Sequence, residues 1–207
     1  MIKRYKANEI NKLAQILKND GVISVPTDTV FGICASIKSK KAYNKLIEVK
    51  NRPFNKSFPV MCATKSQIKK IAVVDKKAEK LIEKFMPGPI TLVLKKNGNL
   101  PSYITNGKDT IAIRMATSKA IEDLINQIDS PIFMTSANQS GKPECTNLDE
   151  IEAFCPLLDG MMEGEVFYAK GSTIVDCTLE DVKILREGPI SLEEIKKTIN
   201  GDRKSVV

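Results

Sequence analysis

The sequence predicts an α/β fold: a single domain with a twisted mixed sheet flanked by helices. Helical and strand-like hydrophobic patterns alternate along the chain, which is typical of that class. The 207 residues, of which 42% are hydrophobic, are enough to bury one sizeable core. No break in composition marks a second domain. We therefore expect one domain over residues 1–200 and a short C-terminal tail over residues 201–207.

The first part of the chain predicts two helices with two strands between them. Asn8 is placed to cap a helix that ends near Gly21, and Ser39 begins the second helix. The apolar runs at residues 22–26 and 31–35 are typical of buried strands. The apolar positions at helical spacing are Ile10, Leu13, Ala14 and Leu17 in the first helix, and Ala42, Leu46 and Val49 in the second.

The middle of the chain predicts three strands and two more helices. Asp75 caps a helix whose apolar face includes Leu81 and Ile82, and the Pro-Gly-Pro run at residues 87–89 stops it. The strands are expected over residues 58–62, 90–94 and 110–114, and the second helix over residues 119–128.

The last part of the chain predicts two capped helices and three strands. Asn147 caps a short helix, and Ser191 with Glu194 forms a capping box ahead of the final helix. The strands are expected over residues 132–135, which run into the polar loop 136–141, and over residues 173–177 and 182–185, which pair around a polar turn.

Composition and motif content exclude several classes of enzyme. Histidine is absent, so His-based triads, His general bases and His-ligated zinc are excluded. The sequence contains no P-loop, no GxGxxG fingerprint and no GxSxG nucleophile elbow. No carboxylate cluster suggests a two-metal site, and we expect no metal ligands on the protein. Nucleotide binding would therefore depend on scattered basic and hydroxyl side chains.

The cysteines and the hydropathy pattern point to a cytoplasmic protein without membrane contact. The five cysteines are odd in number and none has CxxC spacing, so we expect buried, reduced thiols. No apolar run approaches the ~18 residues that a membrane span needs. The basic start of the chain is not followed by the apolar segment of a signal peptide.

The net charge of +7 is unevenly distributed along the chain. Residues 1–84 carry a net charge of +12 and residues 85–207 a net charge of −5. A basic half of this kind suggests an anionic partner, such as a nucleotide, a nucleic acid or a polyphosphate. The alternative is a lysine-rich surface that is simply solvated.

Four polar segments interrupt the ordinary patterning. Residues 26–32 (PTDTVFG) place small polar side chains at a strand end, where ligands bind in α/β sheets, although a turn capped by its own side chains is the alternative. Residues 50–56 (KNRPFNK) place three cations beside a helix-breaking proline, which suits phosphate oxygens or else is a solvated charge run. We expect Lys50 and Arg52 to be exposed there. The other two segments are residues 135–141 (TSANQSG) and residues 172–173 with 185–189 (LREGP).

Two further arginines each end an apolar strand. Arg114 follows the run Ile-Ala-Ile, and Arg186 precedes a Gly-Pro turn. An arginine at the end of a buried strand needs an anionic partner. That partner is either a carboxylate of the protein or a bound ligand.

Taken together, these segments resemble the YrdC/TsaC-type threonylcarbamoyl-AMP synthases. Each motif is weak alone, but seven in the same order are specific, and the resemblance runs from about residue 21 to residue 191. The chain is similar to the short form, without the extra C-terminal domain of longer relatives. The seven motifs are residues 26–32 (PTDTVFG), 50–53 (KNRP), 87–91 (PGPIT), 113–114 (IR), 136–138 (SAN), 172–176 (STIVD) and 185–188 (LREG).

The resemblance implies an enzyme with a basic concave pocket that makes L-threonylcarbamoyl-AMP from L-threonine, bicarbonate or CO₂, and ATP, with release of pyrophosphate. Other tRNA-modification proteins would then move the threonylcarbamoyl group to adenosine 37 of tRNAs that read ANN codons. Both reactants, a carbamate and ATP, are anionic, so the chemistry calls for Lys and Arg rather than a His base. Mg²⁺ bound with ATP is expected as the cofactor.

The resemblance also assigns roles to individual residues. Lys50 and Arg52 would be catalytic. Met61 stands where some members carry a His that contacts threonine, and Ser57 replaces a usual proline; these are the two departures from the family pattern. The implied threonine contacts are Thr29, Met61, Arg114, Ser136 and Ser172, and the implied ATP contacts are Lys50, Arg52, Lys56, Thr110, Asn138, Thr146 and Arg186.

Two other functions fit parts of the sequence. A double-stranded RNA or ribosome-binding module without catalysis needs only the basic half and a suitable shape, and it would not depend on free threonine. Direct contact with tRNA or other RNA is open for the enzyme too. A carbamoyl-AMP-forming enzyme is the second alternative, but relatives with that activity are much larger multidomain chains.

Overall fold

The strands of this protein form one mixed sheet. The computed structural model describes residues 1–53, 56–98, 100–166 and 171–201. Within them, ten strands lie in the order β1-β8-β2-β3-β7-β4-β6-β5-β9-β10, with parallel neighbours such as β4 and β6 beside antiparallel neighbours such as β3 and β7. This confirms the predicted single α/β domain. The strands are β1 (Arg4–Tyr5), β2 (Ile23–Pro26), β3 (Phe31–Ser36), β4 (Val60–Cys62), β5 (Ile90–Lys95), β6 (Thr110–Met115), β7 (Ile132–Ser136), β8 (Gly160–Met162), β9 (Thr173–Asp176) and β10 (Lys183–Arg186).

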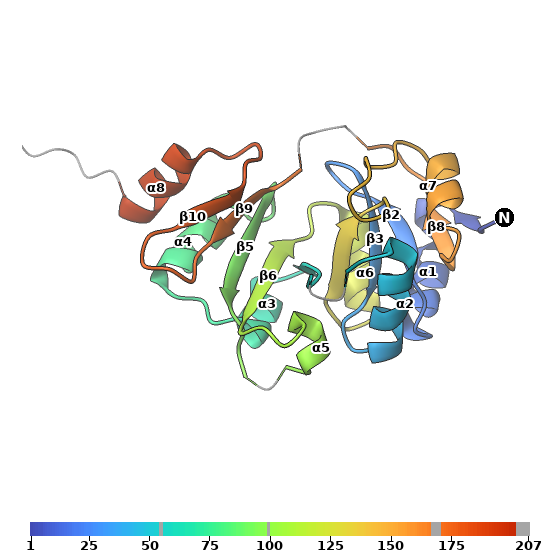
Figure 1. Cartoon of the computed structure of the whole chain (residues 1–207), viewed down its shortest axis with the longest axis horizontal. Coiled ribbons are helices and arrows are strands. Elements are labelled where there is room, and N and C mark those ends of the chain that lie inside the picture. Colours follow the sequence, from blue (N-terminus) through green and yellow to red (C-terminus); the bar gives the residue numbers. More distant parts are fainter. Residues whose placement is uncertain (54–55, 99, 167–170, 202–207) are drawn as a thin grey trace, which may run out of the picture.

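Helices cover both faces of the sheet (Figure 1). Apolar side chains of α1 and α6, including Leu13 and Leu124, share one core cluster with β2 and β7, whereas α2 lies against β3 from the other side. Helices α4 and α8 pack together at the β5–β9–β10 end. The helices are η1 (Ala7–Glu9), α1 (Ile10–Lys18), α2 (Lys40–Lys50), α3 (Lys65–Ile71), α4 (Lys76–Phe85), α5 (Ser102–Thr105), α6 (Lys119–Gln127), α7 (Leu148–Phe154) and α8 (Leu192–Asn200).

Most of the predicted helix starts are confirmed by the hydrogen bonds of their caps. The side chains of Ser39, Asp75 and Asn147 each accept a bond from a backbone N–H three residues on, and the Ser191 capping box is present. The prediction for Asn8 is wrong. That residue lies inside the short 3₁₀ turn η1, which precedes α1.

Several short elements were not predicted, because they carry too little hydrophobic periodicity to be recognised. They are β1, β8, α5 and the seven-residue helix α3, which Thr64 caps. The predicted strand over residues 58–62 is also shorter in the structure, where β4 begins at Val60. Of the predicted tail, only Gly201 lies within the described residues.

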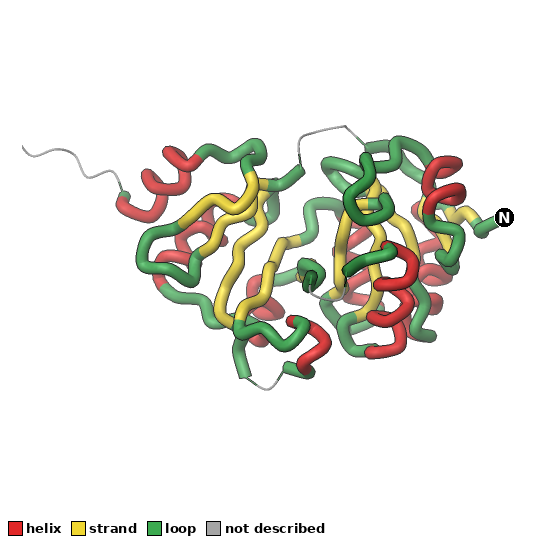
Figure 2. The backbone as a smooth tube through the Cα atoms, viewed as in Figure 1, coloured by secondary structure: helices red, strands yellow, loops and turns green. Residues whose placement is uncertain are grey.

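Strand alternation separates the core from the functional face. In β5, Ile90 and Leu92 enter the core and Thr91 points to the opposite face; in β6, Ile113 enters the core and Arg114 follows it. Figure 2 shows the strands in two groups, which face each other across the middle of the molecule. Side chains from the two groups of strands therefore come together beside β4 and β7, which lie in the middle of the strand order.

The five cysteines are all buried and unpaired, as predicted. Burial raises the pKa of Cys62 and that of Cys177, each to about 12, so both thiols stay protonated at neutral pH. Within the described ranges, no helix has the length and apolar character needed to cross a bilayer.

Candidate active site

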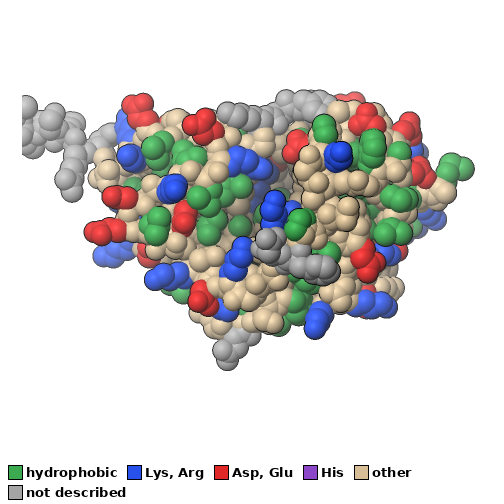
Figure 3. Space-filling view, viewed as in Figure 1, with side chains coloured by type: hydrophobic (Ala, Val, Ile, Leu, Met, Phe, Trp, Pro, Cys, Tyr) green, Lys and Arg blue, Asp and Glu red, His purple; other side chains and the backbone are tan. Residues whose placement is uncertain are grey.

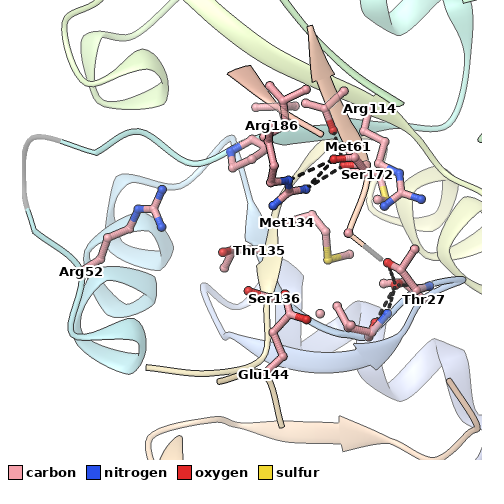
Figure 4. Close-up of a pocket in the computed structure, with 18 residues that line it drawn as sticks. Thr27, Arg52, Met61, Arg114, Met134, Thr135, Ser136, Glu144, Ser172 and Arg186 are labelled. Carbon is pink, nitrogen blue, oxygen red and sulfur yellow. Dashed lines mark hydrogen bonds between the residues drawn. The ribbon is translucent and has the colours of Figure 1, made fainter. Parts of the chain in front are cut away.

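A cavity of about 280 Å³ lies where the two strand groups meet. Figure 3 shows a hollow in the middle of the molecule, with Lys and Arg side chains beside it, and Figure 4 shows the side chains that line it. Its floor includes Met61 of β4 and Met134 of β7. The polar lining side chains are Thr27, Thr29, Arg52, Thr91, Arg114, Thr135, Ser136, Glu144, Ser172 and Arg186.

Arg114 is anchored at one end of this cavity by a carboxylate. Its Nη2 donates to both carboxylate oxygens of Asp28, at 2.6 Å each, and its Nε donates to the carbonyl of Gly88 at 3.3 Å. Only 10% of the Arg114 side chain is exposed. Burial lowers the pKa of Arg114, and the charge of Asp28 opposes that effect. Of the two partners predicted for this arginine, the structure shows the protein carboxylate, while Arg114 still lines the cavity.

Asp28 lies in a turn that Thr27 holds rigid. The Thr27 hydroxyl donates to the carbonyl of Val30 at 2.5 Å and accepts bonds from the backbone N–H groups of Thr29 and Val30, at 3.2 Å each. A threonine in a turn commonly bonds to the local backbone in this way. The predicted alternative of a turn capped by its own side chains is therefore correct for Thr27, and the same turn places Thr29 in the cavity wall.

Arg186 is held by neutral groups of Ser172, the residue directly before β9. It donates to the carbonyl of Ser172 at 3.0 and 2.9 Å and to its hydroxyl at 3.1 Å, and that hydroxyl lies 2.9 Å from the hydroxyl of Thr91. Gly188 allows this close approach, because a Cβ there would lie 2.2 Å from the backbone nitrogen of Thr173. The LREGP segment thus folds back on residues 172–173, as their pairing in the sequence analysis suggested.

Arg52 also lines the cavity, and its partners are neutral as well. Its Nε donates to the carbonyl of Lys56 at 3.0 Å, and its Nη2 donates to that of Ser57 at 2.7 Å. The guanidinium lies 4.5 Å from the ring centre of Phe58, in cation–π geometry. Because Ser57 contributes only its carbonyl to this contact, its departure from the family's proline leaves the contact intact.

Lys50 corrects a prediction, because it is buried rather than exposed. Only 2% of the residue is accessible, and its Nζ donates to the carbonyl of Ser136 and to Oδ1 of Asn138, at 2.5 Å each. Its own carbonyl accepts a bond from the backbone N–H of Ser140 at 2.9 Å. Burial lowers the pKa of Lys50 to about 8. Lys50 is buried because it lies in the last turn of α2, and this turn faces the loop after β7.

The structure brings together some of the predicted site residues and not others. The cavity is lined by Thr29, Arg52, Met61, Arg114, Ser136, Ser172 and Arg186. Lys50 and Asn138 lie behind its wall: Asn138 accepts from Lys50 and from the Ser136 hydroxyl. Lys56 and Thr146 are exposed and do not line it. Thr110 begins β6, four residues and about 13 Å of strand before Arg114.

Three residues that matter in the geometry were not among the predicted site residues. Asp28 and Thr91 occur in the quoted motifs, but no local signal marks either as a partner of a distant arginine or serine. Glu144 was missed entirely. It is the one carboxylate among the described side chains that line the cavity, and it lies in the loop after β7.

The arrangement suits a small ligand with several negative charges. Three guanidinium groups reach the cavity, and of these only Arg114 forms an ion pair with a described carboxylate. Guanidinium groups bind phosphate and carboxylate through paired N–H donors, and the surrounding hydroxyls can add further hydrogen bonds. Fold and cavity together define an α/β protein with a cavity at the middle of its sheet that is suited to a polyanionic small molecule.

A match to a family model identifies the protein family within this class. The model named Sua5_yciO_yrdC, described as "Telomere recombination", matches residues 15–188. The chain therefore belongs to the Sua5/YciO/YrdC family, as the seven motifs predicted.

Two curated relatives and one solved structure show how far the similarity extends. A putative threonylcarbamoyl-AMP synthase of Methanocaldococcus jannaschii is 36% identical over 207 residues, covering 95% of this chain and 97% of the relative. The threonylcarbamoyl-AMP synthase of Pyrococcus abyssi is 34% identical, but only 59% of its length is matched. The crystal structure of P. abyssi Sua5 complexed with L-threonine has a TM-score of 0.88 and 32% identity, covering 96% of this chain and 61% of that one.

Proposed function

We propose that the protein is a threonylcarbamoyl-AMP synthase, which forms L-threonylcarbamoyl-AMP from L-threonine, bicarbonate and ATP. The observation that carries the proposal is the division of charge in the cavity. Arg114 is paired with Asp28, whereas Arg52 and Arg186 have only neutral partners among the described residues. One end therefore suits a zwitterionic amino acid, and the rest suits the phosphates of a nucleotide. The names of the relatives and their nearly full-length match to this chain support the assignment.

The reaction needs alignment and charge neutralisation more than proton transfer. The amine of threonine and bicarbonate give a carbamate and water. A carbamate oxygen then forms a bond to the α-phosphorus of ATP, the bond from that phosphorus to the bridging oxygen breaks, and pyrophosphate leaves. Arg52 and Arg186 would neutralise the phosphate charge as it shifts to pyrophosphate, and Arg114 would hold the threonine carboxylate. A chain without histidine can perform this chemistry.

The loop after β7 would position the two substrates relative to each other. Lys50 fixes that loop through Ser136 and Asn138, and the hydroxyl of Ser136 lies in the cavity wall. We therefore assign Lys50 and Asn138 to positioning the loop. Lys56 and Thr146, which are exposed, would contact ATP at the outer rim.

Mg²⁺ would enter the site with ATP. The described residues contain no group of three His, Cys, Asp or Glu side chains that could hold a metal by themselves. The cavity therefore suits a cation that is held mainly by phosphate oxygens and water. Glu144 is the carboxylate in the described cavity lining that could add a ligand. When bound, the cation supplies positive charge to the triphosphate.

The product would serve tRNA modification. Threonylcarbamoyl-AMP is a mixed anhydride that other proteins would use to modify adenosine 37 of tRNAs reading ANN codons, and we place the reaction in the cytoplasm. An RNA-binding role would add to this activity rather than replace it, because RNA recognition alone does not need a cavity of this size lined by three arginines.

The test measures pyrophosphate release with ATP, Mg²⁺, bicarbonate and each amino acid in turn. We expect release to require both L-threonine and bicarbonate, and the product to carry the mass of threonylcarbamoyl-AMP. Equal release without threonine would contradict the proposal. A product of the mass of carbamoyl-AMP would favour the carbamoyl-AMP alternative, and RNA binding with no release would favour the binding module.

A further inference from the structure

We infer that Asp28 is a positioning residue that makes the Arg114 end of the cavity take an amino acid and reject phosphate. The inference rests on the proposed function and deepens it, because it assigns amino-acid recognition to a residue outside the cavity lining. Three features carry it: where the pair lies in the sheet, how firmly Asp28 is held, and how the charges differ between the cavity arginines.

The Asp28–Arg114 pair crosses the sheet. Asp28 lies in the turn between β2 and β3, and Arg114 lies on β6, with β7 and β4 between β3 and β6. At about 4.8 Å per strand, three strand spacings separate the two elements by ~14 Å. The ion pair lies at the end of the cavity that Arg114 lines, and Figure 4 shows Arg114 there beside Met61.

The backbone of the turn that carries Asp28 is held without any contribution from Arg114. The hydroxyl of Thr27 fixes the turn through three hydrogen bonds to the backbone of Thr29 and Val30. The turn therefore fixes the backbone from which the Asp28 carboxylate reaches Arg114. Both of its oxygens accept from the same nitrogen, Nη2 of Arg114. The other terminal nitrogen, Nη1, has no hydrogen-bond partner among the described residues, and it stays available to a ligand carboxylate.

The charge of the pair then decides which ligand can occupy that end. An unpaired arginine binds phosphate and carboxylate alike. With Asp28 bound to Arg114, the pair is close to neutral, and a phosphate placed there would face a carboxylate at short range. A zwitterionic amino acid brings both charges, so its carboxylate can meet Nη1 while its amino group lies on the side of Asp28. Arg52 and Arg186 have no such carboxylate and stay open to phosphate.

The experiment compares ligand binding by the full chain and by Asp28→Asn. Calorimetry measures the affinity for L-threonine, alone and in the presence of inorganic phosphate, and separately the affinity for pyrophosphate. For Asp28→Asn we expect threonine to bind at least tenfold more weakly and phosphate to compete with it, while pyrophosphate affinity stays within about twofold. Asp129→Asn is the matched control, because Asp129 is an exposed loop aspartate that also pairs with a cation, Lys38. It should behave like the unmodified protein.

Other outcomes separate the inference from the proposed function. If Asp28→Asn binds threonine as the unmodified protein does, or if phosphate does not compete, the inference is overturned. If threonine and pyrophosphate affinities fall together with the melting temperature, Asp28 is only structural. If Asp28→Asn does not fold, Asp28→Glu, which keeps the charge, must weaken threonine binding and still exclude phosphate. If the unmodified protein binds no threonine at all, the proposed function fails, and phosphate binding to Asp28→Asn alone still tests Asp28.

Discussion

The two ends of the cavity hold their arginines by different means. Arg114 projects from a strand, is nearly buried and is bound by a carboxylate of the protein. Arg52 lies in the loop after α2, where two backbone carbonyls and an aromatic ring hold it without opposite charge. An ion pair such as Arg114–Asp28 can stabilise the fold and shape the binding site at the same time. A cation held by backbone carbonyls, such as Arg52, is not neutralised by the protein, so its charge remains available to a ligand. Stability and activity should therefore be coupled at Arg114 and separable at Arg52.

The largest effect is expected for Arg114→Ala, which tests whether stability and activity are coupled at this residue. The change leaves Asp28 unpaired, and we expect it to lower the free energy of unfolding by about 2–3 kcal/mol and to abolish threonine-dependent pyrophosphate release. This is less than the ~3–5 kcal/mol for a fully buried pair, because 30% of the Asp28 side chain is exposed. Urea unfolding and a pyrophosphate assay measure the two effects.

Two further variants sharpen the Arg114 result. Removing Asp28 as well, in Arg114→Ala with Asp28→Ala, should recover part of the lost stability but none of the activity. Arg114→Lys keeps the charge but cannot reproduce the planar guanidinium that binds Asp28 and a ligand carboxylate together, so it should raise the KM for threonine more than that for ATP. Unchanged unfolding of Arg114→Ala would show that the pair does not hold the two strand groups together.

Arg52→Ala should separate activity from stability. The loss of a charged phosphate contact should cost roughly 2–4 kcal/mol in kcat/KM for ATP. The loss of the contact with the Phe58 ring should cost only about 0.5–1 kcal/mol in unfolding. Steady-state kinetics and thermal melting measure the two quantities.

Arg4→Ala is the matched control for Arg52. Arg4 is an arginine outside the cavity that pairs with Asp149 and Glu152. Its removal should leave ATP kinetics unchanged. Full activity of Arg52→Ala would show that the uncompensated charge at this end serves no ligand.

The remaining prediction concerns the pH dependence of stability at Lys50, which lies between the two cases because it is buried but bound only by neutral acceptors. Burial lowers its pKa from 10.5 to about 8. Between these two values the unfolded chain binds more protons at this residue than the folded protein does, so stability from this group rises with pH. Below pH 8 both states are protonated, and the cost of burying the charge is fully present.

Lys50→Met provides the comparison that isolates this effect. Relative to Lys50→Met, the unmodified protein should gain stability as the pH rises from 8 to 10.5, by up to about 3 kcal/mol. Urea unfolding of both proteins across that range measures the difference. A constant difference in stability would mean that the Lys50 amine has an ordinary pKa and is solvated.

Sequence reasoning recovered the elements that depend on local patterns. The caps at Ser39, Asp75, Asn147 and Ser191 and the main strands were found, since capping and alternation act over three or four residues. Some of the shortest elements, such as β1 and α5, were missed, because they depend on neighbours far away in the chain. The site also divides into residues that could be found from the sequence and residues that could not. The resemblance to the family identified seven residues of the cavity, but it did not identify Glu144.

The fold class, the family and the kinds of side chain that line the cavity could be inferred from the sequence alone. The pairing of these side chains depends on the tertiary structure. Asp28 and Arg114 are 86 residues apart, and they meet because β7 and β4 set the distance between β3 and β6. Lys50 and Arg52 are two positions apart, yet one turns into the protein and the other into the cavity, because α2 ends between them at Asn51, in the left-handed conformation. Charge pairing depends on distances in space, and the order of residues along the chain does not contain them.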